Sequence, residues 1–326
     1  RLVVFGGNAR DEELNDTWEW DGTTWEERTS LPTPGTGGGF GQDATTDNAF
    51  YVGGYVTAGG FDLQPAWWFD GAHWTRVPTD GPSARSDAMV AVQGTEAVVF
   101  GGASGSGAFA KLYSDTWTWS QEGGWTKRGD AGPDARSQGA MAADPVRGRV
   151  VLFGGKSKTG KLGDTWEWDG SGWSHVGSAE GGPAARSDAA MCWDSAAEAL
   201  VLVGGVDASK SLLGDVWAYD GGAWTKRDQS AGNIQRARAA VACTADGRLV
   251  SVGGYMPGEA PTIIGAGEQW ANGGWHTLPD LAPPRFGGKL LRTPGGLVHF
   301  GGSTSNFETT WDDFSDAWRL TEVPAQ

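Results

Sequence analysis

A glycine doublet that ends a short apolar run recurs along the whole chain, and it constrains the fold more than any other feature. Copies of the doublet are 47–53 residues apart and begin at Gly6, Gly53, Gly101, Gly154, Gly204, Gly253 and Gly301. A fixed period of this kind indicates one supersecondary unit that is copied and stacked. The sequence therefore predicts a single domain over residues 1–326, with seven repeats and no linker between them.

Each repeat has the pattern of a four-stranded antiparallel meander. A segment of alternating small and apolar residues, such as ARSDAMVAV, and the apolar run before the doublet both indicate strands. Two tryptophans two residues apart, such as Trp166 and Trp168, then place both rings on one face of a third strand. The hairpin signal Asp169-Gly170 leads to Trp173 on a fourth strand, and other repeats have the same order.

All but three of the 19 tryptophans fall in this register, which predicts that their rings fill the space between stacked repeats. The three exceptions are Trp68, Trp193 and Trp311. Trp68 and Trp193 lie in predicted strands and are interpreted as packing variants. Trp311 lies in a predicted loop, where a large exposed ring is commonly a contact residue.

The sequences VVFGG...NDTWEWDGTTW, VLFGG...LGDTWEWDGSGW and VLVGG...LGDVWAYDGGAW resemble the repeats of the Kelch family of β-propellers. Repeats of that family carry a glycine doublet, an aromatic residue on the third strand and a tryptophan on the fourth. The resemblance covers essentially the whole chain. It implies an all-β fold, a seven-bladed Kelch-type β-propeller of four-stranded antiparallel blades.

Repeats 1 and 7 are incomplete in this pattern. Repeat 1 lacks its first strand, and repeat 7 lacks its last. We expect either that residues before Arg1 supply both strands or that Leu320 to Pro324 form an edge strand instead.

Charge and composition narrow the range of partners. The chain has 25 Lys+Arg against 40 Asp+Glu, a formal net charge of −15, which repels phosphate backbones and anionic lipid surfaces. Nucleic acids and membranes are therefore not expected as partners, and we expect a monomer. Low lysine and cysteine with abundant tryptophan and glycine suggests a bacterial exported or cell-surface protein.

The two cysteines, Cys192 and Cys243, lie in the first strands of neighbouring repeats. Buried free thiols are the default expectation, since the sequence cannot set the distance between the two sulfurs. A disulfide between them is the alternative.

Strand alternation predicts which face of the propeller carries function. The segments entering the first strand of each blade and the loops joining strands two and three share one face, called the loop face below. The opposite face has short hairpins. Irregular loops on a rigid scaffold commonly carry binding sites, so the ligand site is expected on the loop face.

An arginine stands where the first strand begins in each of repeats 3 to 7. These residues are Arg85, Arg136, Arg186, Arg236 (or Arg238) and Arg285. In Kelch-type adaptor subunits of ubiquitin ligases, arginines at similar positions bind carboxylates of a partner peptide, so the resemblance implies an anion-binding rim. The alternative is structural, because the RSD segments at 85–87 and 186–188 supply carboxylates that could neutralise such arginines within their own blades. Both interpretations stay open.

Three repeats depart from the common pattern on the loop face. A binding site is expected at such departures, because it makes the repeats differ from one another. Tyr55 and Tyr255 follow the doublets of repeats 2 and 6, and Glu268 replaces the first tryptophan of repeat 6. Phe307 and Trp311 lie in the acidic loop of repeat 7. With the arginines, these residues would form a mixed pocket that suits peptides and sugars.

Catalytic motifs are not found. The four histidines do not converge on a motif, and no nucleophile elbow, P-loop or HExxH segment is present. Glu308, Asp312 and Asp316 resemble the Glu-x3-Asp-x3-His iron site of plant Kelch nitrile-specifier proteins, but they depart from it at the third ligand. Asp316 also aligns with a structural aspartate of other repeats, so no metal or other cofactor is expected.

These observations favour a non-catalytic recognition module that binds a protein, a peptide or another anionic ligand at the loop face and its arginine rim. The alternative is a small-molecule enzyme or sugar-active propeller with a central-pocket site, dependent on a metal held by residues 308–316.

Overall fold

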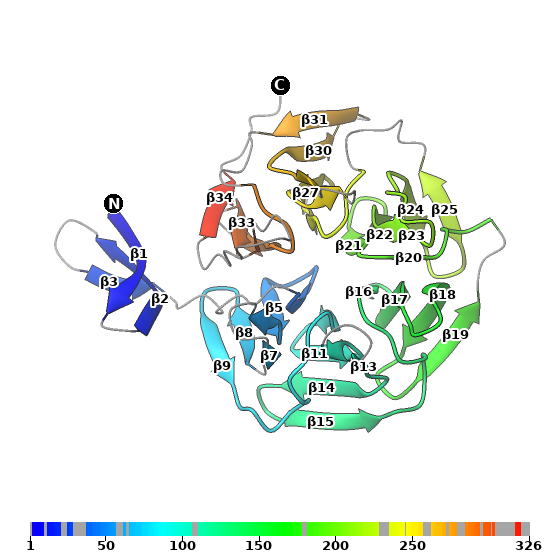
Figure 1. Cartoon of the computed structure of the whole chain (residues 1–326), viewed down its shortest axis with the longest axis horizontal. Helices are drawn as coiled ribbons and strands as arrows, with labels where there is room; N and C mark the ends of the chain where they lie inside the picture. The colour runs from blue at the N-terminus through cyan, green and yellow to red at the C-terminus, as the bar shows by residue number, and fades with distance from the viewer. Residues whose placement is uncertain are drawn as a thin grey trace.

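The chain forms an all-β ring of antiparallel sheets around a central channel (Figure 1). This computed structural model describes residues 2–9, 12–20, 25–28, 37–56, 61–62, 65–105, 110–177, 181–227, 235–244, 246–256, 262–271, 274–278, 284–293, 296–300, 302–303 and 317–320. Every regular element in these ranges is a strand, as the sequence predicts. Within the same ranges, no helix is long and apolar enough to cross a membrane.

Five sheets have four strands each, paired in sequence order from the channel outward, and each is a complete blade numbered here by its repeat. Blade 2 consists of β4 (Gly39–Gln42), β5 (Asn48–Val52), β8 (Ala66–Asp70) and β9 (Trp74–Val77). Blade 3 consists of β10 (Met89–Gln93), β11 (Glu96–Phe100), β14 (Thr116–Ser120) and β15 (Gly124–Gly129). Blade 4 consists of β16 (Ala140–Asp144), β17 (Arg149–Lys156), β18 (Lys161–Trp168) and β19 (Trp173–Gly177). Blade 5 consists of β21 (Ala190–Asp194), β22 (Ala199–Val203), β24 (Val216–Tyr219) and β25 (Trp224–Arg227). Blade 6 consists of β26 (Ala240–Cys243), β27 (Leu249–Val252), β30 (Gly267–Ala271) and β31 (Gly274–Leu278).

Two three-stranded sheets lie at the ends of the chain. The N-terminal sheet consists of β1 (Leu2–Ala9), β2 (Glu12–Trp20) and β3 (Trp25–Arg28). The C-terminal sheet consists of β32 (Lys289–Thr293), β33 (Gly296–Phe300) and β34 (Ala317–Leu320).

Short ribbons in the loops bring the loop face together. They are β6 (Tyr55–Val56) with β7 (Phe61–Asp62), β12 (Ala103–Ser104) with β13 (Lys111–Leu112), β20 (Arg186–Ser187) with β23 (Val206–Asp207), and β28 (Tyr255–Met256) with β29 (Thr262–Ile263). In blade 5, β20 enters the first strand and pairs with β23, which follows the glycine doublet. The bridge between Ser86 and Ala103 repeats this pairing in blade 3. The predicted sharing of one face by these two kinds of segment is therefore confirmed.

The two three-stranded sheets belong to repeats 1 and 7, which the sequence predicts to be incomplete. The part of the chain described thus confirms a β-propeller of four-stranded blades, but not the full count of seven blades. It holds five complete blades, and the innermost strands contact one another in the order β4, β10, β16, β21, β26, β32 and back to β4. The sheet of repeat 1, β1 to β3, lies beside the ring in Figure 1. The edge strand considered for Leu320 to Pro324 falls mostly outside the described residues.

Side chains of blade 2 and the C-terminal sheet close the ring. The Gln42 amide donates to the Arg292 carbonyl at 2.7 Å and accepts from the Arg292 N–H at 2.8 Å. The Arg292 guanidinium donates to the Asp43 carbonyl at 2.7 Å. The Phe300 ring packs edge-on against Phe40, with 5.7 Å between centroids. Segments some 250 residues apart in the sequence are thus joined by polar and aromatic contacts.

Aromatic rings fill the space between blades, as their register predicts. The Phe50 ring of blade 2 lies 5.4 Å from Trp119 of blade 3, and Phe153 of blade 4 lies 5.2 Å from Trp224 of blade 5. Trp68 and Trp193 are both buried in these clusters, which confirms them as packing residues. Trp311 lies outside the described residues.

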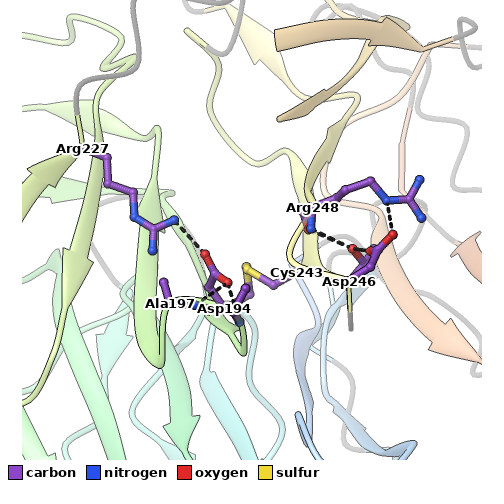
Figure 2. Close-up of a disulfide and its surroundings, with 9 residues drawn as sticks. Asp194, Ala197, Arg227, Cys243, Asp246 and Arg248 are labelled. Atoms are coloured by element: carbon purple, nitrogen blue, oxygen red, sulfur yellow. Dashed lines mark hydrogen bonds and ion pairs between the residues drawn. A yellow bond between two sulfur atoms is a disulfide. The ribbon is translucent and has the colours of Figure 1, made fainter. Parts of the chain in front are cut away.

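The two cysteines are joined, so the default expectation of free thiols is wrong. Cys192 and Cys243 form a disulfide between the innermost strands β21 and β26, with 5.6 Å between their Cα atoms. Figure 2 shows this bond with the neighbouring Asp194 and Asp246 turns. The sequence could not decide the matter because the distance depends on how neighbouring blades pack.

The closure contacts give a test of the ring. We expect Arg292→Met to lower the free energy of unfolding by about 1–3 kcal/mol, because it leaves backbone carbonyls of blade 2 without a charged donor. Urea denaturation measures the change. The control is Lys127→Met, whose pair with Asp130 is 46% and 64% exposed on its two sides, and whose loss should cost about 0.5 kcal/mol or less. Equal losses in the two variants would show that closure does not depend on Arg292.

Candidate functional site

The five arginines of the predicted rim are buried, each with 2% or less of its surface exposed. In blades 3, 4 and 5 they form two-pronged ion pairs with the aspartate that stands two residues before the first tryptophan of the third strand. The shortest N–O distances are 2.7 Å for Arg85–Asp115, 2.6 Å for Arg136–Asp164 and 2.6 Å for Arg186–Asp215. These pairs support the structural interpretation of the repeated arginines.

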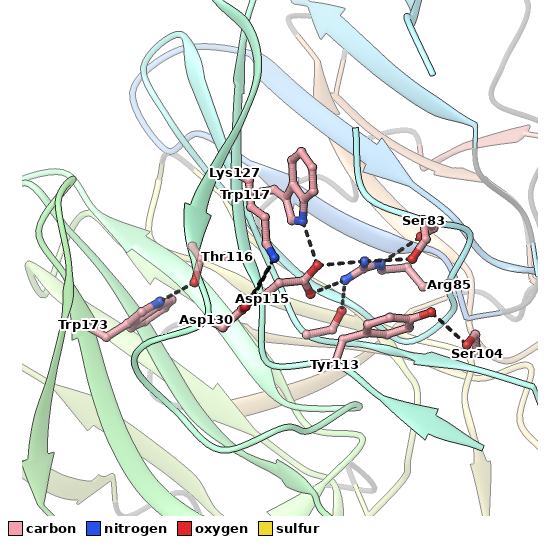
Figure 3. A network of polar contacts seen from close by, with 11 residues as sticks. Ser83, Arg85, Ser104, Tyr113, Asp115, Thr116, Trp117, Lys127, Asp130 and Trp173 are labelled. Atoms are coloured by element: carbon pink, nitrogen blue, oxygen red, sulfur yellow. Dashed lines mark hydrogen bonds and ion pairs between the residues drawn. The ribbon is translucent and has the colours of Figure 1, made fainter. Parts of the chain in front are cut away.

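Each ion pair also ties the loop face of its blade together. Figure 3 shows the blade 3 example, in which Arg85 donates to the Gly101 carbonyl and to both oxygens of Asp115. The Trp117 indole N–H donates to the same carboxylate at 2.7 Å. The glycine doublet, the arginine, the aspartate and the first tryptophan of a repeat are therefore parts of one buried polar unit.

Hydrogen bonds to the charged form lower the pKa of these aspartates. Burial alone would raise the pKa of Asp164, but donors from Arg136 and Trp166 outweigh it and hold that pKa below its ordinary value of 3.8. The pKa of Asp115 and of Asp215 is lowered in the same way.

The acid stability of the fold should therefore depend on these pairs. A carboxylate with a lowered folded pKa stabilises the protein above its unfolded pKa, and this contribution is lost as the pH falls through the folded pKa. We expect Asp164→Asn to cost about 3 kcal/mol at pH 7, because it leaves Arg136 buried without a counter-charge. The variant should then lose less further stability than the parent below pH 4, as measured by urea denaturation across pH. Asp130→Asn, at a carboxylate 64% exposed, is the control, and a parent-like acid profile in Asp164→Asn would contradict the prediction.

Blade 6 departs from this unit. Ala266 replaces the aspartate and Glu268 replaces the tryptophan, so the Glu268 carboxylate lies 4.0 Å from the Arg236 guanidinium. Arg236 donates instead to the Ala266 carbonyl at 2.6 Å. Glu268 is buried and does not line the central channel. Tyr255 lies in β28 with its ring 5.6 Å from Phe286, and burial raises its pKa.

The remaining predicted residues are placed only in part. Tyr55 belongs to the ribbon strand β6. Phe307, Trp311 and the metal candidates Glu308, Asp312 and Asp316 lie outside the described residues. Within the ranges that are described, no group of three or more His, Cys, Asp or Glu side chains could hold a metal ion.

One residue of each of repeats 2 to 7 forms a ring at the loop-face end of the channel. These residues have left-handed backbone conformations with φ between 52° and 77°, and they are Gly37, Asp87, Gln138, Asp188, Arg238 and Gly287. The N–H of each donates to the carbonyl of the one before it, with five such bonds of 2.6–3.2 Å from Asp87 round to Gly287. Four of the six positions have side chains in a conformation that favours glycine, and such strained residues cluster at functional sites.

The side chains of this ring meet across the channel. The Arg238 guanidinium binds Asp188 in the neighbouring blade at 2.8 Å and Asp87 on the far side at 3.2 Å. Gln138 donates to Asp87 at 3.4 Å. Burial would lower the pKa of Arg238, but the two carboxylates outweigh it and raise that pKa, so Arg238 stays charged. The four side chains, with Lys289 below, are called the channel mouth.

Lys289 is the unusual member of the channel mouth. It lies two residues after Gly287 and lines a cavity of about 220 Å³ together with Arg238 and Asp87. The other repeats place apolar or small residues at its register, namely Gly39, Met89, Ala140, Ala190 and Ala240. Among the described residues, its ammonium has no hydrogen bond or ion pair, and burial lowers its pKa to about 8.

Most of this site is not among the residues predicted from the sequence. Asp87 and Asp188 are expected from the sequence only as partners of the repeated arginines, and Lys289 is not a predicted site residue. A usable signal was present, because the residue two after the repeated arginine varies among Asp, Gln, Arg and Gly while the arginine itself does not. The mouth can bind a polar ligand, and none of the residues that line the cavity is a histidine.

Four-stranded antiparallel blades arranged around a channel, with irregular loops on one face, define a β-propeller. The family model described as the KLHDC2/KLHL20/DRC7 Kelch-repeats domain matches residues 39–254, and the chain belongs to this Kelch-repeat family. The predicted family is thus confirmed. A solved structure titled "Structure of YjhT" matches with a TM-score of 0.71 and 16% sequence identity, over 91% of this chain and 97% of that one. At this identity the likeness concerns the fold alone. A comparison with curated proteins found no match.

Proposed function

We propose that this Kelch propeller is a recognition module that binds an acidic peptide at the channel mouth on its loop face. The observation that carries the proposal is Lys289, a partly buried ammonium that lines the cavity and has no direct partner among the described residues. A buried charge is unfavourable unless it is paired. Asp87 attracts the Lys289 ammonium without forming an ion pair with it, so a ligand carboxylate placed beside the ammonium would supply a closer counter-charge.

The proposed site lies on the predicted loop face, but the cation that would bind the anion is Lys289 and not an arginine of the rim. The arginines of the rim are buried, and in blades 3, 4 and 5 aspartates already neutralise them. Arg238 is bound by two carboxylates at once. Lys289 is the remaining cation at the mouth, and it attracts an anion locally even though the chain as a whole is acidic.

The size and charge of the mouth favour one side chain of a peptide rather than a whole protein surface. A cavity of about 220 Å³ can hold a glutamate or aspartate side chain or a chain terminus. Asp87 and Gln138 lie across from Lys289 and would accept or donate hydrogen bonds to the amide groups of the same peptide. The loops around the mouth would contact its neighbouring residues.

The alternative hypothesis, an enzyme with a central-pocket site, requires Glu268 or Glu308 to point into that pocket. Glu268 does not line the cavity, and Glu308 lies outside the described residues, so neither supports it. The Cys192–Cys243 disulfide supports the proposal of an exported or cell-surface protein, because disulfides persist in oxidising compartments.

Lys289→Met tests the proposed site. Short synthetic peptides that each contain one glutamate are compared with their glutamine counterparts by fluorescence polarisation. We expect the parent to prefer the glutamate peptides, and the variant to bind them about 10–100-fold more weakly, the usual value of a hydrogen bond to a charged group. Lys127→Met, at an exposed lysine on the outer strand of blade 3, is the control.

Two further readouts separate a binding role from a structural one. Because burial already disfavours the Lys289 ammonium, the variant should be at least as stable as the parent at pH 7. Affinity in the parent should fall as the pH rises above about 8, since only the charged form binds an anion. No preference for glutamate over glutamine, or full binding by Lys289→Met, would contradict the proposal.

A further inference from the structure

The interfaces between blades 3 and 4 and between blades 4 and 5 share two contacts. In each, the fourth-strand tryptophan of one blade donates its indole N–H to a threonine of the previous blade. The distances are 2.9 Å for Trp173 to Thr116 and 2.9 Å for Trp224 to Thr165. A phenylalanine ring of the previous blade also packs edge-on against that tryptophan, Phe100 in one case and Phe153 in the other.

The interface between blades 5 and 6, called the 5/6 interface, lacks both contacts. Val216 stands where the threonine is expected, and Val203 stands where the phenylalanine is expected. Trp275, the fourth-strand tryptophan of blade 6, therefore has a buried indole N–H with no hydrogen-bond partner among the described residues.

A second defect lies on the same face of blade 6. Ser251 pairs with Glu268 at the register where the neighbouring blades pair leucine with tryptophan, Leu152 with Trp166 and Leu202 with Trp217. Both replacements are buried, at 1% and 5% exposure. In the described structure, the Ser251 hydroxyl and one Glu268 carboxylate oxygen have no hydrogen-bond partner.

The strand geometry places this defect against blade 5. Leu249 and Trp270 are two residues away from Ser251 and Glu268, and side chains two apart on a strand share a face. Leu249 and Trp270 pack with Val203 and Val216 of blade 5. The buried polar atoms of blade 6 therefore lie at the 5/6 interface, where its counterparts bury apolar surface.

The disulfide spans this same interface. Cys192 lies on β21 of blade 5 and Cys243 on β26 of blade 6, and both line the channel. Figure 2 shows that the bond lies near the turns at the far ends of these strands. At the loop-face end, the Arg238–Asp188 ion pair crosses between the same two blades.

We propose that the 5/6 interface is a weak joint of the ring, that the Cys192–Cys243 disulfide holds it closed, and that reduction of this bond loosens the channel mouth. The effect on ligand binding rests on the function proposed above, whereas the weak joint does not. Loosening would act on the mouth because blade 5 supplies Asp188 and blade 6 supplies Arg238.

The reductant is a dithiol. Its first thiolate attacks one cysteine sulfur, the bond between Cys192 and Cys243 breaks, and the other sulfur leaves and takes up a proton. Its second thiol then forms the reagent's own disulfide and releases the first cysteine. The protein gains two electrons and two protons, and the dithiol loses them.

Hydrogen exchange of the oxidised and dithiothreitol-treated protein tests the weak joint. We expect reduction to speed amide exchange in β21 and β26 about tenfold or more, with about threefold or less in β10 and β16 of blades 3 and 4. Exchange that is unchanged at the 5/6 interface, or that rises equally in all blades, would overturn the proposal. Cys192→Ser/Cys243→Ser should behave as the reduced protein and should not respond to the reagent.

A repaired interface provides the decisive comparison. Val216→Thr restores a partner for Trp275, and Ser251→Leu with Glu268→Trp and Ala266→Asp copies the pattern of blades 4 and 5. In the fourfold variant, reduction should change exchange at β21 and β26 by about threefold or less. If the fourfold variant does not fold, Val216→Thr alone is used: it keeps the shape of the side chain and adds a hydroxyl that can accept from Trp275, and it should give partial protection. If reduction speeds amide exchange in both the single and the fourfold variant as much as in the parent, these contacts are not what weakens the 5/6 interface.

Peptide binding is measured separately on the same samples. If reduction loosens the 5/6 interface and weakens binding of the glutamate peptides in the parent but not in the repaired variant, both proposals hold. If the exchange result holds while the oxidised parent binds no peptide, the proposed function fails and the weak joint stands. If the peptides bind equally before and after reduction, the coupling between the disulfide and the mouth is wrong.

Discussion

Every blade of this protein has two apolar faces, and the need to cover both is the constraint on which the rest of the structure depends. A single blade cannot meet it, so each blade packs against two neighbours, and the series must return to its start. The ring of blades closes where β32 contacts β4, through Arg292, Gln42 and the ring of Phe300. Closure brings one residue of each of repeats 2 to 7 to the same end of the channel, where the ligand site is proposed.

The repeat and its departures have different roles. Features that recur, such as the pair of Arg136 with Asp164, are buried and hold the loop face of each blade together. Features that occur once, such as Lys289, lie where the ring brings different repeats together. A charged residue that appears five times at one register is best explained by what every blade needs. A charged residue that appears once calls for an explanation of its own.

Locally unfavourable features gather at two places. Around the mouth, side chains occupy left-handed conformations and an ammonium is partly buried without a partner among the described residues. At the 5/6 interface, a buried serine and glutamate replace a leucine and a tryptophan. Blades 3 and 4 are joined by the Trp173–Thr116 hydrogen bond, and the disulfide supplies a covalent link at the 5/6 interface, where the corresponding contact is missing. Under the function proposed above, stability and recognition would depend on different positions of the same repeat.

The sequence by itself determined the repeat, the four strands of each blade, the family, the face that carries the irregular loops and the packing role of the tryptophans. These follow from local patterns, since a period of two places residues on strand faces and a glycine doublet marks the end of a buried strand. Only the tertiary structure decided that β32 meets β4, that Cys192 reaches Cys243, and that Arg238 binds both Asp87 and Asp188 while Lys289 pairs with neither. Those contacts join residues about 50 to 250 positions apart, and their distances are set by how the blades close around the channel rather than by any local pattern.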